Sequence, residues 1–94
     1  MNEQYNKQYE LVMRYLEQST QVSYILAFTI EQTEDRKKAL RLMCVRCELI
    51  KHTSRIQNLL LECSAENDME IKLATLNRII ATSDQALKDA LNSL

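Results

Sequence analysis

Two of the three cysteines, Cys44 and Cys47, form a CxxC pair, the spacing found in thiol redox centres and in zinc sites. A thioredoxin-like pair lies at a helix N-terminus after a strand, whereas this pair lies about ten residues inside a predicted helix. Structural zinc normally needs four ligands, and the remaining candidates, His52 and Cys63, lie roughly 100° or more away on the helical wheel. We therefore predict small core or boundary cysteines and no cofactor, with a redox or metal role as the alternative.

His52 is the only histidine, and Glu48 is its only obvious catalytic partner at a helical neighbour position. Such a pair on a solvated helix face usually has no catalytic role. The chain has no glycine and therefore no glycine-rich phosphate loop, and no Glu-x-x-His pair indicates a di-iron bundle. These observations predict a protein without enzymatic activity.

Basic residues are concentrated between Arg36 and Arg55, where seven of the twelve lysines and arginines occur with a single acid, Glu48. A basic stripe that could contact nucleic acid or an acidic protein consists of Lys37, Lys38, Arg41, Lys51 and Arg55. His52 shares its face on the helical wheel, but no aromatic residue interleaves it to stack on bases. We favour a solvated face or an inter-helix salt-bridge edge, because an antiparallel hairpin would bring Glu10 level with Arg55.

Arg46 lies near the centre of the apolar arc of the predicted middle helix. The same hairpin sets it opposite Ser19 and near Ser23, which predicts a polar layer in the seam between the first two helices. Such layers weaken packing but can set register or oligomeric state, or meet a carboxylate from another chain. The alternative is that the guanidinium extends to the edge of the seam.

Residues 22–30 are apolar on nearly every face of the predicted first helix. Leu26 and Ile30 continue the seam, whereas other apolar side chains point away from it. Exposed apolar surface of this kind commonly marks a protein contact. The predicted partner-binding residues are Val22, Tyr24, Ile25, Phe28 and Arg46. The alternative is that the third helix covers this part of the first.

The chain contains no glycine and no proline, whereas average usage would give roughly eleven of them. This absence predicts the secondary structure that positions these residues. Without tight-turn residues, long helices are favoured. Apolar positions alternate by four and three in the first and last thirds of the chain, which predicts single seams of the coiled-coil type. In the middle third they cover about half the helix circumference, as expected for a helix with two neighbours.

The sequence thus predicts an all-α fold: an antiparallel three-helix bundle with coiled-coil-like seams in one domain, residues 1–94, which dimerisation could complete. Helices are expected at about 3–31, 34–64 and 68–92, with caps at Thr33 and Asn67 before the second and third.

The expected function is that of a non-enzymatic protein–protein interaction module, a small chaperone or regulatory adaptor that binds a partner protein or itself. The alternative is a dimeric helical nucleic-acid-binding protein that uses the basic stripe. The polar N-terminus and the short apolar stretches predict a cytoplasmic protein without a membrane partner.

Overall fold

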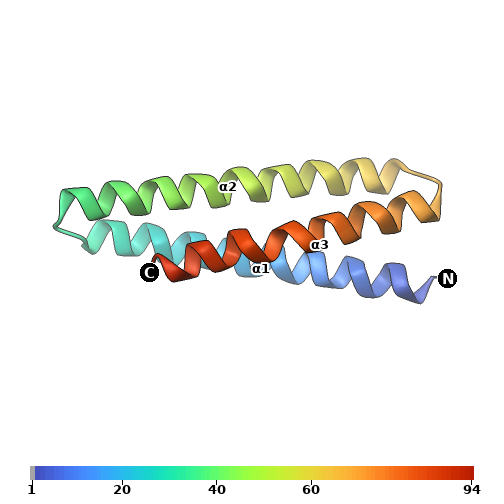
Figure 1. Cartoon of the computed structure of the whole chain (residues 1–94), viewed down its shortest axis with the longest axis horizontal. Coiled ribbons are helices and arrows are strands. Elements are labelled where there is room, and N and C mark those ends of the chain that lie inside the picture. The colour runs from blue at the N-terminus through green and yellow to red at the C-terminus, as the bar shows by residue number, and fades with distance from the viewer. Residues whose placement is uncertain (1) are drawn as a thin grey trace.

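The computed structural model describes residues 2–94 and contains three α-helices: α1 (Glu3–Gln32), α2 (Arg36–Ala65) and α3 (Met69–Asn92). α2 runs antiparallel to α1 and α3, and short turns at opposite ends connect the helices (Figure 1). The predicted all-α three-helix bundle is confirmed, and each helix boundary lies within two residues of its expected position. None of these helices is long and apolar enough to span a membrane.

The N-terminus of α2 is capped by Asp35, whose carboxylate accepts hydrogen bonds from the backbone N–H groups of Lys37 at 3.0 Å and Lys38 at 3.4 Å. The expected cap, Thr33, instead ends α1, and its hydroxyl donates to the carbonyl of Thr29 at 2.6 Å. The prediction was wrong by two residues because the carboxylate closest to the helix satisfies the free N–H groups of its first turn.

Asp68 caps α3 and accepts a hydrogen bond from the N–H of Glu70 at 2.9 Å, so the predicted cap at Asn67 was wrong by one residue. The carboxylate of Glu66 accepts from the N–H groups of Asn67 and Asp68, at 3.0 Å each. No residue within 2–94 has a positive φ. Acidic side chains and extended backbone therefore make the turns for which many proteins use glycine.

The core is organised around four buried residues of α2, seven positions apart: Leu42, Leu49, Ile56 and Cys63. This spacing keeps them on one line that faces both neighbouring helices. α1 and α3 also pack against each other, so each helix has two neighbours. The predicted single seams are confirmed, because the buried residues of each helix follow one line at spacings of three, four or seven, and this line faces both neighbours: Val12, Tyr15, Ser19, Val22 and Leu26 in α1, and Leu76, Ile79, Ser83 and Ala90 in α3.

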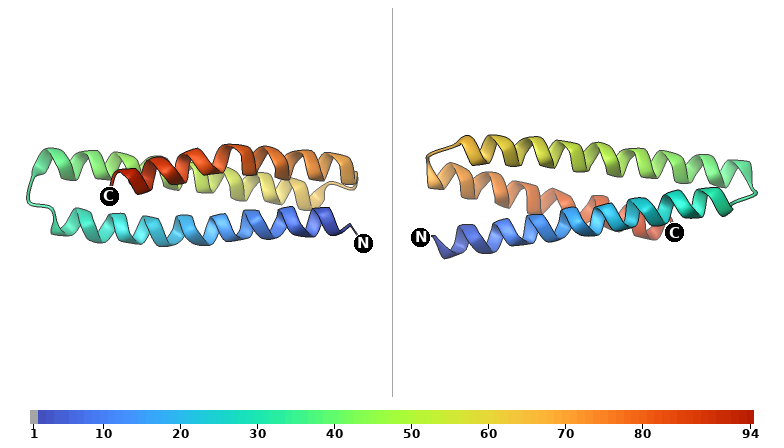
Figure 2. Two further views of the ribbon diagram at one scale, coloured as in Figure 1. Left: turned by 60° about the horizontal axis from the view of Figure 1, so that its bottom comes forward. Right: turned by 180° about the vertical axis from the view of Figure 1, so that it is seen from behind.

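α3 has 24 residues, whereas α1 and α2 have 30 each. At 1.5 Å per residue it is roughly 9 Å shorter than its neighbours. Ala90, near its C-terminal end, is buried with Leu26 of α1 and Leu42 of α2. The last turn of α1 and the first turn of α2 therefore project beyond α3 as a two-helix hairpin (Figures 1 and 2).

We expect Asp35→Ala to lower the free energy of unfolding by about 1 kcal/mol, because it removes the acceptor for two N–H groups of α2. Urea denaturation followed by circular dichroism measures this change. Glu34→Ala is the matched control, since Glu34 is exposed and acidic but caps no helix, and it should change stability by less than about 0.5 kcal/mol. Equal losses in the two variants would contradict the assignment of the cap.

Candidate functional site

Two aromatic residues of α1 project into solvent from its second half, Tyr24 at 71% and Phe28 at 65% exposure. They are four residues apart and therefore neighbours on one helix face. Ile25 is also exposed, but it lies seven residues after Gln18, which lines a groove against α3, so it is on a different side of α1. Val22 is only 6% exposed and packs in the core, which corrects its expected place on the contact surface.

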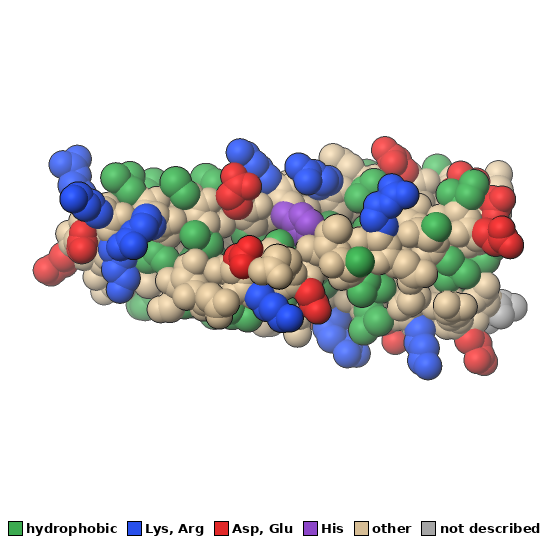
Figure 3. All heavy atoms as spheres, in the orientation of Figure 1, with side chains coloured by type: hydrophobic (Ala, Val, Ile, Leu, Met, Phe, Trp, Pro, Cys, Tyr) green, Lys and Arg blue, Asp and Glu red, His purple; other side chains and the backbone are tan. Residues whose placement is uncertain are grey.

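An exposed apolar stripe runs along the first half of α2 at spacings of three and four: Leu40, Met43, Cys47 and Ile50. Figure 3 shows exposed apolar side chains over α2 near the α1–α2 turn. All four positions belong to the broad apolar arc that was expected to contact two neighbours, and their exposure contradicts that expectation. They lie about 100° or more from the buried ladder of α2, so each reaches a neighbouring helix only at its edge, as Ile50 does at the groove with α1.

The groove between α1 and α2 borders both sets of residues, but most of the side chains that line it are Ser, Thr and Gln. Tyr24 from α1 and Ile50 from α2 both line it, and its volume is about 250 Å³. We name Tyr24, Phe28 and the α2 stripe together the α1–α2 apolar surface. The α2 residues were missed as candidate contacts because the wheel gave their spacing but not the direction of the core.

Arg46 lies half-buried in this groove, and its Nε donates a hydrogen bond to the carbonyl of Ser23 at 3.1 Å. No carboxylate within residues 2–94 forms an ion pair with it. Ser19 also lies at the groove but is only 1% exposed, and its hydroxyl lies near the hydroxyl of Tyr15 beneath the surface. The polar layer expected from the hairpin register is therefore present.

An acidic line follows the outer edge of the groove on α1. Glu10, Glu17, Tyr24 and Glu31 are exposed and seven residues apart, so they share one line along the helix. Tyr24 lines the groove, which places the three carboxylates on the same rim. The repeat of seven is a signal that sequence reasoning could have used.

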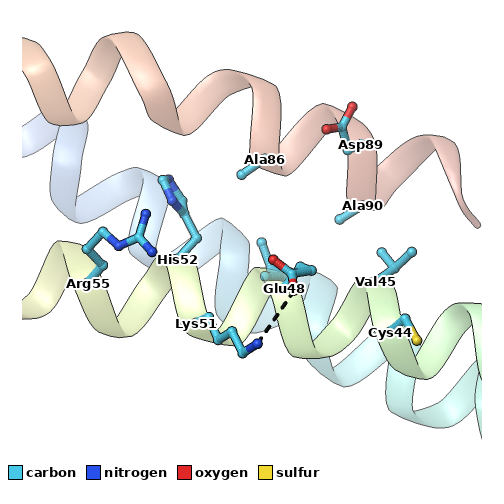
Figure 4. Close-up of a pocket in the computed structure, with 10 residues that line it drawn as sticks. Cys44, Val45, Glu48, Lys51, His52, Arg55, Ala86, Asp89 and Ala90 are labelled. Carbon is cyan, nitrogen blue, oxygen red and sulfur yellow. Dashed lines mark ion pairs between the residues drawn. The ribbon is translucent and has the colours of Figure 1, made fainter.

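The basic stripe lies on the opposite side of α2, where every one of its five members is exposed. Lys51 and Arg55 line a hollow of about 440 Å³ between α2 and α3, together with Ala86 and Asp89 (Figure 4). Figure 3 shows basic side chains over the first turns of α2 and again over its middle, with acidic side chains among them.

The expected salt-bridge edge with α1 does not form, because Arg55 faces α3 and not Glu10. The single ion pair within residues 2–94 joins Lys51 Nζ to Glu48 Oε1 at 3.6 Å, and both side chains are exposed. A surface pair of this kind contributes little to stability. The basic stripe is thus a solvated face that remains free to meet a ligand.

His52 lines the same hollow as Lys51 and Arg55, as expected from the helical wheel, but its side chain is less exposed than theirs. Its ring is half-buried and meets the ring of Tyr15 edge to face, with 6.1 Å between centroids. In Figure 4 it extends from α2 toward the space between the helices. Burial of the ring, with a smaller effect of the Arg55 cation, lowers the pKa of His52. Its Nε2 is buried without a hydrogen-bond partner, so the neutral ring is favoured.

Cys44 and Cys47 are both exposed free thiols, contrary to the expected core or boundary position. Cys63 is buried and completes the ladder of α2. Within residues 2–94, no three side chains of the types His, Cys, Asp or Glu are grouped closely enough to hold a metal ion.

We expect the free energy of unfolding to fall as the pH drops from about 7 to about 5, in part because of His52. Its pKa is lower in the folded chain than in the unfolded chain, so protons bind the unfolded state more readily below the usual value of about 6.5. His52→Gln should show a smaller fall, measured by urea denaturation across this pH range. An identical pH dependence in both proteins would contradict the assignment.

The described residues therefore offer two distinct surfaces on opposite sides of α2. One combines exposed apolar side chains with a partly buried guanidinium and can bury a partner's apolar face. The other is hydrophilic and mainly basic. Comparison with models of protein families, with curated proteins and with solved structures finds no match for this chain.

Proposed function

We propose that this protein is a non-enzymatic interaction module that binds a helix of a partner protein on the α1–α2 apolar surface. The observation that carries the proposal is the exposure of large apolar side chains on both helices that border the groove, Tyr24 and Phe28 on α1 and Met43 and Ile50 on α2. Contiguous apolar surface on a small protein commonly marks a site of protein contact.

The shape of the surface supports an α-helix as the bound element. The α2 stripe spans residues 40–50, which corresponds to about 15 Å or three helical turns. An amphipathic helix laid along a groove presents residues at spacings of three and four, which match the spacing of the stripe. The projecting aromatic side chains of Tyr24 and Phe28 supply rigid contact area of the kind that dominates binding energy.

A partner of different sequence is favoured over a second copy by the charge of the groove. Two copies related by a two-fold axis through the groove would bring two Arg46 side chains together, and each groove floor lacks a carboxylate to offset that repulsion. Within this class, we propose a small chaperone or regulatory adaptor, because a chain of 94 residues presents one helix-sized surface rather than several.

The experiment compares three forms of the protein: wild type, the double variant Tyr24→Ser/Phe28→Ser, and the control Leu61→Ser. Leu61 is 69% exposed and lies on α2 eleven residues beyond Ile50 and past Gln57, the last α2 residue that lines the groove. Each form is tested for capture of protein from the native cell by affinity purification with mass spectrometry. We expect the double variant to lose at least about tenfold of a specific captured protein that Leu61→Ser retains.

Light scattering on the purified chain distinguishes the partner from a second copy. A monomer with capture that depends on Tyr24 and Phe28 supports the proposal. Capture that is unchanged in the double variant contradicts it, as does a stable dimer that the double variant converts to monomers.

The alternative, a nucleic-acid-binding protein, stays a prediction and is supported by the exposure of the basic stripe. Phosphate contacts by its lysines and arginines would give an affinity for generic RNA or DNA that falls steeply with salt. Fluorescence anisotropy at low and moderate salt measures this affinity, and Lys37→Gln/Arg41→Gln should weaken it. Glu48 and Asp89 lie among the basic side chains and oppose phosphate binding, and a lack of binding at low salt would reject this alternative.

A further inference from the structure

This inference rests on the proposed function: we propose which charged residues the bound helix carries. It inserts one carboxylate, from Asp or Glu, against Arg46 at the centre of its apolar face, and it presents Lys or Arg along the edge that faces α1. The groove is thus a carboxylate-reading site within an apolar docking surface.

The first step of the argument is the state of the Arg46 guanidinium. Its Nε–H is used by the Ser23 carbonyl, which orients the plane of the group, while no Asp or Glu of residues 2–94 pairs with it. The side chain is only half-exposed, so a docked apolar helix would remove much of its remaining water. A buried guanidinium without an anion is strongly unfavourable, and a carboxylate is the group whose geometry matches its paired N–H donors.

The other side chains around Arg46 are the second observation. Most of them are uncharged and polar, among them Ser23, Ser54 and Gln57. Hydroxyl and amide groups can donate hydrogen bonds to a carboxylate, and none of them brings a negative charge that would compete with a carboxylate for Arg46.

The rims of the groove determine which way the helix faces. On the α1 rim, Glu17 and Glu31 flank Tyr24 at intervals of seven residues. On α2, the residues that line the groove beside Arg46 are uncharged, among them Ile50 and Ser54. A helix with basic residues on one edge and neutral residues on the other complements both rims, whereas the reversed arrangement would leave the glutamates unpaired.

The test uses two designed amphipathic peptides of about three heptads with a leucine face and lysines along one edge. They differ at one central position of the apolar face, which is Glu in one peptide and Gln in the other. Isothermal titration calorimetry measures both affinities for wild type, for Arg46→Gln and for the control Arg55→Gln. Arg55 is an equally cationic residue of α2 that lines the hollow on the α3 side.

Wild type should bind the Glu peptide about tenfold more tightly than the Gln peptide, since a charge-assisted hydrogen bond replaces a neutral one. Arg46→Gln should abolish this preference and Arg55→Gln should keep it. A preference that survives Arg46→Gln, equal binding of both peptides by wild type, or binding of neither peptide would overturn the inference.

The variant Arg46→Leu distinguishes a loss of the preference for Glu from a loss of folding. A leucine at this seam position should leave the melting temperature equal or higher, because it removes a charge from a partly apolar site, while the preference for Glu is lost. A lower melting temperature with the preference intact would overturn the inference. The failures are separable, because the capture experiment tests Tyr24 and Phe28 and does not depend on Arg46: retained capture with no Glu preference rejects the carboxylate alone.

Discussion

The buried ladder of α2 determines where every other surface of the bundle lies. Leu42, Leu49, Ile56 and Cys63 recur every seven residues, and that repeat keeps them between α1 and α3 along the whole helix. Positions beside the ladder face one neighbour only, as Arg46 faces α1. Side chains of α2 that point away from the ladder lie largely outside the contacts with α1 and α3, and they remain exposed even where they are apolar. The exposed stripe and the basic stripe are both consequences of this geometry.

Two sides of α2 consequently carry different chemistry. Toward α1, mostly uncharged polar side chains, with Tyr24 and Ile50, surround a guanidinium that already donates to a backbone carbonyl. Toward α3, Lys51 and Arg55 lie with Glu48 and Asp89 around an open hollow. Binding on the α1 side gains most from the exclusion of water, because burial strengthens an electrostatic contact and also removes apolar surface from water. The second side interacts through screened charges, whose contribution falls with salt.

The polar residues in the middle of the bundle are a cost to the fold. Tyr15, Ser19 and His52 each bury a polar atom that makes no hydrogen bond. Burial raises the pKa of the Tyr15 phenol, and the nearby Ser19 hydroxyl opposes that rise, while burial lowers the pKa of His52. Each shift favours the uncharged form. Aliphatic residues of similar volume would pack better here, so the layer does not stabilise the fold.

The amino-acid sequence by itself determined the three helices and the place of Arg46 beside Ser23, because both follow from local propensity and from counting along a hairpin. It also identified the apolar surplus that contains Tyr24 and Phe28. Only the tertiary structure decided which apolar residues are core: it buried Val22 and exposed most of a stripe counted as buried. Periodicity gives the angle between side chains on one helix, but the direction of the core depends on where two other helices lie. For the same reason, the basic stripe does not meet the acidic residues of α1. Two residues at the same height along a hairpin can point to different sides of it.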